Sequence, residues 1–143
     1  MTRVVVSRRK DAGGTLHTVT VPDHVDILCR MTSGAQARLR FSAVIGFARA
    51  PEVWLYGSEA TLHLDLRDGI LRGGRRGDDD LREISVAPEM EGRWRVEQEF
   101  VNAMRGEEVV THTSFEDGVK YMEFTDAVVR SAETGQAVTL SSA

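Results

Sequence analysis

The chain has little cysteine and no long hydrophobic run. Cys29 is the single cysteine among 143 residues, so no disulfide can form within the chain, and a disulfide-stabilised secreted fold is excluded. No stretch approaches the roughly 18 apolar residues that a membrane-spanning helix needs. In the first ten residues the basic cluster follows the apolar residues, which is the reverse of a secretory signal. These absences predict a cytoplasmic protein with no membrane partner.

An excess of basic charge is also absent. The sequence has 18 Lys and Arg residues against 22 Asp and Glu residues, for a net charge of −4, and both signs are scattered along the chain. A nucleic-acid-binding protein needs a concentrated basic face, so we expect no nucleic-acid partner. The short basic run Arg8-Arg9-Lys10 is predicted to be a solvated loop.

Length and composition are those of an ordinary globular domain. Hydrophobic residues make up 41% of the chain and charged residues 28%. A chain of this length corresponds to one domain and can bury about 68–70% of its unfolded surface. We therefore predict that residues 1–143 form a single domain with a core of its own.

Residues 25–43 carry the clearest pattern. Apolar and polar side chains alternate in two runs on either side of Thr32-Ser33-Gly34. Alternation predicts two strands, each with one buried and one solvated face, and Gly34 suits the loop position that needs a positive φ. The predicted register pairs three sets of residues: Ile27 with Leu39, Val25 with Phe41, and Asp26 with Arg40.

Leu28 and Cys29 are neighbours in the first of these strands and fall on opposite faces. Leu28 falls on the polar face, either as an isolated exposed leucine or as part of a face that meets another subunit. Cys29 alternates in phase with the apolar residues and is predicted to be a small core side chain.

Shorter apolar runs predict further strands, separated by turns rich in glycine and aspartate. Residues 53–56 are continuously apolar and are predicted to lie in the sheet interior, and residues 73–80 form an exposed hairpin tip. The other strands are expected at residues 3–7, 62–66, 70–72, 81–86 and 137–140.

The pattern changes to a helical period near the end of the chain. An amphipathic helix is predicted over residues 93–104, closed by Gly106. A longer helix begins after the cap residue Ser114 and stops at Gly135, and Gly118 within it suggests a close approach of the backbone to the sheet. Its buried stripe is predicted to contain Phe115, Val119, Met122 and Val129, with Phe124 on the opposite face.

These elements predict an α+β fold. An antiparallel-rich open β-sheet of six to eight strands is followed by two C-terminal helices packed on one of its faces.

Residues that could carry chemistry are present but dispersed. Gly73-Gly74 and Gly77 precede a strand and not a helix, so they do not form a dinucleotide loop. Arg75-Arg76 could bind an anion, although a salt-bridged loop is the preferred interpretation. The remaining candidates are too few or too far apart for a tight metal site, which needs three or four ligands: His17, His24 with Asp26, His63, His112, and Asp78-Asp79-Asp80. We therefore predict no catalytic, cofactor-binding or metal-binding residue in this chain.

Four short motifs follow one another between residues 19 and 140. They are VDIL at 25–28 with SGA at 33–35, GSEATL at 57–62, FVNAMRG at 100–106 and AVVRSAETG at 127–135. Their order and spacing resemble the C-terminal domain of the Gfo/Idh/MocA family of NAD(P)-dependent oxidoreductases, with Ala60 in place of a second glycine in the second motif.

This resemblance implies a parent enzyme that acts on a sugar, an inositol or a similar polyol. In the family, NAD or NADP and the catalytic lysine belong to an N-terminal Rossmann domain, which this sequence lacks. A family histidine precedes the sheet on a helix, and neither His17 nor His24 matches that position. By resemblance, the chain contributes one wall of the substrate pocket and an open sheet face for homo-oligomerisation, and the chain alone is expected to be inactive.

A second hypothesis belongs to a different class. A stand-alone domain derived from this one would have lost catalysis and kept only assembly or ligand binding. Nicotinamide binding by the isolated chain with micromolar affinity would contradict the first hypothesis.

Overall fold

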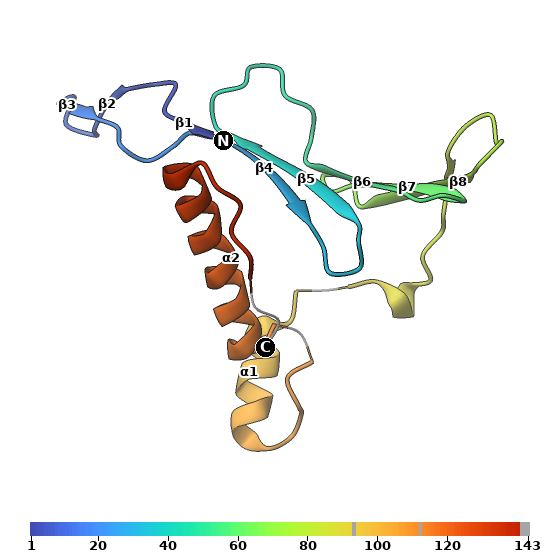
Figure 1. Cartoon of the computed structure of the whole chain (residues 1–143). Coiled ribbons are helices and arrows are strands. Elements are labelled where there is room, and N and C mark those ends of the chain that lie inside the picture. The colour runs from blue at the N-terminus through green and yellow to red at the C-terminus, as the bar shows by residue number, and fades with distance from the viewer. Residues whose placement is uncertain (93, 112, 141–143) are drawn as a thin grey trace. The chain divides into compact units, whose positions relative to one another are not determined.

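The computed structural model describes residues 1–92, 94–111 and 113–140, and in these residues strands come first and helices last (Figure 1). This order confirms an α+β fold with antiparallel sheets and two C-terminal helices. The elements are β1 (Thr2–Arg3), β2 (Arg8–Lys10), β3 (Leu16–Thr18), β4 (His24–Arg30), β5 (Gln36–Ser42), β6 (Glu52–Tyr56), β7 (Ala60–Asp65), β8 (Ile70–Arg75), β9 (Arg82–Glu83), a 3₁₀ helix (Pro88–Met90), α1 (Val96–Arg105) and α2 (Phe115–Thr134).

The chain divides into two compact units. One contains residues 1–45 and 95–143, and the other contains residues 46–94. The first unit holds β1 to β5 and both helices, whereas the second holds β6 to β9. The prediction of a single domain was based on length and stays a prediction.

Every strand pair in the described residues is antiparallel, and the strands are divided among three sheets. The sheet orders are β1-β4-β5, β2-β3 and β6-β7-β8-β9. Each pairing except that of β1 with β4 joins consecutive strands through a short connection, which is the pattern of hairpins.

The β4–β5 hairpin has the register predicted from the alternation. Its pairs include Ile27 with Leu39, Val25 with Phe41, and Asp26 with Arg40. Gly34 lies at φ 88°, and its amide donates to the Met31 carbonyl at 2.9 Å. The turn thus needs the conformational freedom of glycine at this position.

The N-terminal strand predictions were wrong in detail. Residues 4–6 are not a strand, because the Asp23 carboxylate accepts the amides of Val5 at 2.7 Å and Val6 at 3.0 Å. Amides bonded to a side chain are not available to a ladder. The basic run at Arg8–Lys10 is strand β2 and not a loop, although all three of its side chains are exposed.

The sheet of β6 to β9 also departs from the expected pattern. β6 lies at its edge and not in its interior. β8 extends to Arg75, so residues 73–75 pair with β7 and do not belong to the hairpin tip. A Cβ on Gly73 would lie 2.7 Å from Ile84 Cδ1 and 2.9 Å from Leu62 Cδ2, so glycine lets these side chains lie over the strand. The strand expected over residues 81–86 is limited to β9.

The start of α2 and the C-terminal ends of both helices are those that the sequence indicates, whereas α1 begins at Val96, later than predicted. Ser114 and Asp117 form a reciprocal capping box at the start of α2. Gly106 and Gly135 close α1 and α2 in the left-handed conformation, at φ 71° and 69°. Arg93, where the first helix was expected to begin, lies outside the described residues, and residues 137–140 do not form the predicted final strand.

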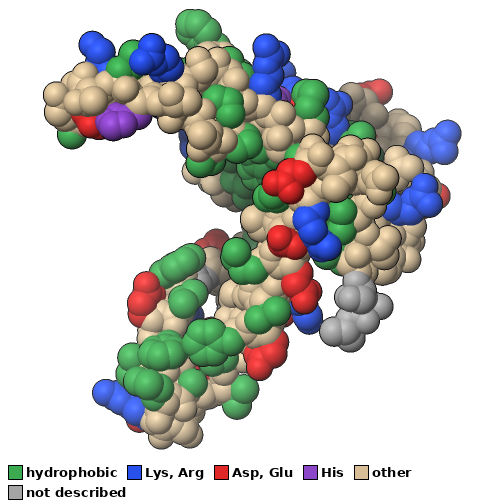
Figure 2. Space-filling view, turned by 60° about the vertical axis from the view of Figure 1, so that its left-hand side comes forward, with side chains coloured by type: hydrophobic (Ala, Val, Ile, Leu, Met, Phe, Trp, Pro, Cys, Tyr) green, Lys and Arg blue, Asp and Glu red, His purple; other side chains and the backbone are tan. Residues whose placement is uncertain are grey.

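The apolar stripe predicted to be buried on α2 is exposed. Phe115 is 83% exposed and Met122 is 66% exposed, whereas Phe124 on the other face is half-buried. Ala127 is the one hydrophobic side chain in the described part of the chain that is fully buried. Hydrophobic side chains accordingly gather on the surface of the part that carries the helices (Figure 2).

Gly118 makes no close approach to other backbone. A Cβ at this position would meet nothing within 4 Å, and the residue lies inside α2 with ordinary helical geometry. Gly118→Ala is therefore expected to raise the free energy of unfolding by about 1 kcal/mol through helix propensity alone. Urea denaturation measures the change, and a loss of stability would mean that this helix face is covered.

Candidate functional site

A surface pocket of about 520 Å³ lies in the unit of residues 46–94. Its volume falls within the roughly 300–1,000 Å³ that is usual for small-molecule sites. It lies where the β6–β7 turn meets the end of β8 and the segment that leads to β9. The lining residues are Gly57, Ser58, Ala60, Thr61, Gly74, Arg75, Arg76, Asp78, Asp80 and Leu81.

Backbone hydrogen bonds fix the two sides of this pocket to each other. The Gly57 amide donates to the Ala60 carbonyl at 2.9 Å and closes the β6–β7 turn. The Arg76 amide donates to the Glu59 carbonyl at 2.8 Å, which joins the end of β8 to that turn. A Cβ on Gly74 would lie 3.2 Å from the Asp80 carbonyl oxygen, so glycine permits the segment at Asp80 to lie close against β8.

The two pocket carboxylates are bonded to backbone. Asp78 Oδ2 accepts the Arg75 amide at 2.8 Å, and Asp80 Oδ1 accepts the Leu81 amide at 2.7 Å. The guanidinium groups of Arg75 and Arg76 form no ion pair with any residue that the structure describes. The salt-bridged loop preferred from the sequence is therefore not formed: the carboxylates of Asp78 and Asp80 accept backbone amides and form no ion pair with Arg75 or Arg76.

The histidines of the described chain lie apart, and each is paired with one carboxylate. The Nε2–carboxylate distances are 2.7 Å for His17 with Asp11, 2.9 Å for His24 with Asp26, and 3.1 Å for His63 with Glu52. His112 lies outside the described residues. Across residues 1–92, 94–111 and 113–140, no three His, Cys, Asp or Glu side chains come together as metal ligands. The single cysteine, Cys29, is half-buried, and its thiol donates a weak hydrogen bond to the Ala37 carbonyl at 3.8 Å.

Asp26 is the most strongly perturbed of the described acids. Arg40 Nε donates to Asp26 Oδ1 at 2.9 Å, and His24 Nε2 lies 2.9 Å from Oδ2. The hydrogen bond from Arg40, and secondarily that from His24, lowers the pKa of Asp26 from 3.8 to about 2. The pairing of Asp26 with Arg40 across the hairpin was predicted from the register, and His24 was named with Asp26 as a candidate pair of ligands.

Asp26→Asn is expected to reduce the loss of stability in acid. A carboxyl group with a lowered pKa stabilises the folded state above its unfolded pKa of 3.8, and this contribution disappears as the pH falls toward about 2. The variant lacks this titration, so its urea midpoint should fall less than that of the wild type between about pH 5 and pH 2.5. Asp79→Asn, in an exposed loop, is the matched control. Equal acid sensitivity of wild type and Asp26→Asn would contradict the prediction.

An aromatic ladder that sequence reasoning missed lies on one face of β6 and β7. The ring of Trp54 stacks on that of His63 with centroids 4.1 Å apart, and on that of Tyr56 at 5.8 Å. His63 lies directly opposite Trp54 in the register and is buried. Residues at alternate positions of β6 could have indicated this ladder, but only once the partner strand and its register were known.

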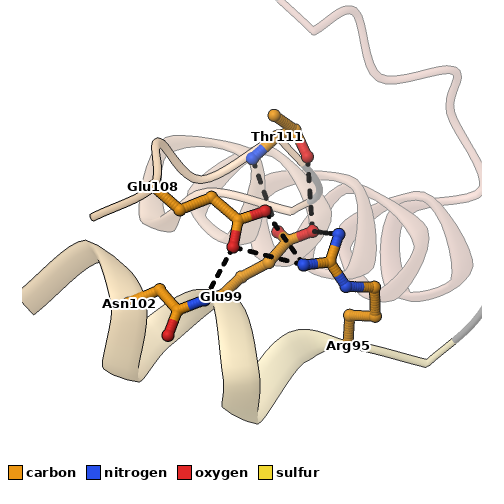
Figure 3. Close-up of polar contacts among 5 residues, drawn as sticks. All are labelled: Arg95, Glu99, Asn102, Glu108 and Thr111. Atoms are coloured by element: carbon orange, nitrogen blue, oxygen red, sulfur yellow. Dashed lines mark hydrogen bonds and ion pairs between the residues drawn. The ribbon is translucent and has the colours of Figure 1, made fainter.

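A second polar cluster connects the first turns of α1 to the segment after it (Figure 3). Glu99 is 2% exposed and is the most buried large side chain of the described residues. Its carboxylate accepts from the Thr111 amide at 3.4 Å and from the Thr111 hydroxyl at 3.3 Å, and it lies 4.0 Å from the Arg95 guanidinium. Arg95 and Glu99 stand four residues apart on consecutive turns, which is the one signal that the sequence offered for this cluster.

Glu108 completes the cluster. Arg95 Nη2 donates to both of its carboxylate oxygens, at 3.0 and 3.2 Å, and Asn102 Nδ2 donates at 2.8 Å. These hydrogen bonds, first from Asn102 and then from Arg95, lower the pKa of Glu108. Because every group in the cluster is engaged with another, the arrangement anchors the segment to the helix and leaves no open reactive group.

No helix among the described residues combines the length and apolar character needed to cross a bilayer. No model of a known protein family matches the chain, and no curated protein matches it.

Proposed function

We propose that this chain is the C-terminal substrate-pocket and oligomerisation domain of a cytoplasmic NAD(P)-dependent oxidoreductase of Gfo/Idh/MocA type, which acts on a sugar, an inositol or a similar polyol. Three of the motifs behind this resemblance fall where the chain turns or a helix closes. Residues 57–62 contain the β6–β7 turn and the start of β7, residues 100–106 end α1, and residues 127–135 end α2.

The observation that carries the proposal is the exposure of large apolar side chains on regular elements. On α2, Phe115 and Met122 are exposed, and Leu55 on the edge strand β6 is 59% exposed. Extended apolar surface on a soluble protein marks an interaction site. A domain that covers one side of a substrate pocket and also joins subunits requires such surfaces.

The division of roles follows from the proposal. NAD or NADP and the catalytic lysine belong to a separate Rossmann domain, and the present chain shapes the cavity without supplying a reacting group. The open face of the β4–β5 hairpin, where Leu28 is 82% exposed beside Arg38 and Arg40, is the proposed contact between subunits.

A nicotinamide titration tests the cofactor part of the proposal. Adding the purified chain to NADH or NADPH should leave the cofactor fluorescence without a saturable change. A dissociation constant in the micromolar range would contradict the assignment of the cofactor to another domain. In the gene, an in-frame Gly-x-Gly-x-x-Gly segment upstream of the Met1 codon would favour the oxidoreductase over a stand-alone assembly module, and an independent promoter there would favour the module.

Light scattering tests the subunit contact. Leu28→Glu should lower the molar mass measured in solution, because it removes the one apolar side chain from this face and places a charge at the proposed contact between subunits. Leu16→Glu alters an exposed leucine in the separate β2–β3 sheet and is the matched control. A wild-type chain that is monomeric at all concentrations would overturn the oligomerisation part alone.

A further inference from the structure

We propose that the pocket formed by residues 57–61 and 74–81 binds a small hydroxylated molecule that carries an oxyanion, either a carboxylate or a phosphate. The inference goes beyond the proposed oxidoreductase, because it depends on the unit of residues 46–94 alone and involves no nicotinamide. It would hold equally for a stand-alone ligand-binding module.

The anionic part of the ligand is indicated by the two arginines. Arg75 and Arg76 both line the pocket, and neither guanidinium forms an ion pair with the described residues. A guanidinium group presents a planar fork of donors that matches the two oxygens of a carboxylate or phosphate. Two guanidinium groups that line one pocket, with no carboxylate partner among the described residues, therefore provide the positive charge for one bound oxyanion.

The hydroxylated part of the ligand is indicated by the acceptors beside the arginines. Asp78 and Asp80 each use one oxygen to accept a backbone amide, and the second oxygen of each can accept a further hydrogen bond. The hydroxyl groups of Ser58 and Thr61 line the same pocket. Two carboxylates would repel a bare anion, but they accept hydrogen bonds from ligand hydroxyl groups. The mixed charge thus favours a sugar acid or a sugar phosphate over inorganic phosphate.

The pocket is also held in shape before any ligand arrives. Ala60 pairs with Arg75, and Thr61 pairs with Gly74, in the ladder between β7 and β8. The bond from the Arg76 amide to the Glu59 carbonyl extends this ladder, and on the other side Arg82 pairs with Gly73 in the ladder between β8 and β9. Because the backbone on both sides is fixed, ligand binding orders only the arginine side chains, which limits its entropic cost.

Calorimetry on the full chain tests this site with four probes: gluconate, glucose 6-phosphate, glucose and inorganic phosphate. Gluconate or glucose 6-phosphate should bind at least about tenfold more tightly than both glucose and inorganic phosphate, since a tenfold ratio corresponds to one ordinary hydrogen bond or ion pair. If gluconate binds more tightly the oxyanion is a carboxylate, and if glucose 6-phosphate binds more tightly it is a phosphate. Absence of binding by both, or equal binding of inorganic phosphate, would overturn the proposal.

Variants distinguish binding by the pocket arginines from a general effect of positive charge on the protein. The double variant Arg75→Gln with Arg76→Gln should lose at least about tenfold in affinity, whereas Arg82→Gln, on β9 of the same sheet but outside the pocket lining, should not. An equal loss of affinity in Arg82→Gln would contradict the placement of the ligand in this pocket.

Asp80→Asn keeps an oxygen for the Leu81 amide and removes one negative charge, so it should lower the affinity for gluconate and raise the affinity for inorganic phosphate. If the affinities for gluconate and inorganic phosphate changed in the same direction, Asp80 would not accept a hydrogen bond from a ligand hydroxyl group. Circular dichroism confirms that each variant is folded.

Discussion

Glu99→Ala is expected to lower the free energy of unfolding by about 2 kcal/mol, within the roughly 1.5–3 kcal/mol that a hydrogen bond to a charged group contributes. The side chain is 2% exposed and accepts two hydrogen bonds from Thr111. Truncation removes these bonds and leaves a cavity in a region with little other buried volume. Arg95 retains Glu108 as a partner, which limits the loss.

Urea denaturation of three variants separates the contributions. Gln98→Ala, next in sequence and exposed on the same helix, is the control and should change stability by no more than about 0.5 kcal/mol. Glu99→Gln keeps the volume and one acceptor, so it should lie between the control and Glu99→Ala. A loss below about 1 kcal/mol for Glu99→Ala would mean that this cluster does not hold the segment of Thr111 against α1.

Gly34→Val is expected to cost about 2 kcal/mol of unfolding free energy. Gly34 lies at φ 88° in the turn of the β4–β5 hairpin. A residue with a Cβ pays about 1–2 kcal/mol in the left-handed region, and a β-branched side chain is strongly disfavoured there. The space around Gly34 is open, with nothing within 4 Å of a built Cβ, so the backbone conformation alone causes the loss.

The control for this substitution is Ser33→Val, at the preceding turn residue, which does not have a positive φ. Hydrogen exchange gives a local measurement, because the Met31 amide donates to the Ala35 carbonyl at 2.8 Å across the turn. In Gly34→Val this amide should exchange faster, and in Ser33→Val it should not. Equal stability of the two variants would contradict the argument from φ.

The sequence identified part of the candidate pocket but not the hydrogen-bond partners of its aspartates. Arg75 and Arg76 were visible as an anion candidate, and the aspartates after them favoured a salt-bridged loop. In the structure the carboxylates of Asp78 and Asp80 accept the amides of Arg75 and Leu81, and neither carboxylate pairs with Arg75 or Arg76. The conformation of the turn decides from which donor an aspartate accepts a hydrogen bond. The spacing of charged residues along the chain does not specify that conformation.

Local patterns determined the features that depend on nearby residues. The β4–β5 register, the positive φ at Gly34, the capping box at Ser114 and the glycine ends of both helices follow from interactions within about twenty residues. These interactions form in the same way wherever the element is placed.

Features that depend on distant residues were decided only by the tertiary structure. The edge position of β6, the exposure of Phe115 and the burial of Glu99 each depend on which surface lies against the element. A hydrophobic period shows which face of an element is apolar but carries no information on what covers that face. Long-range packing supplies this information, and so it decided which apolar surfaces of this protein are exposed.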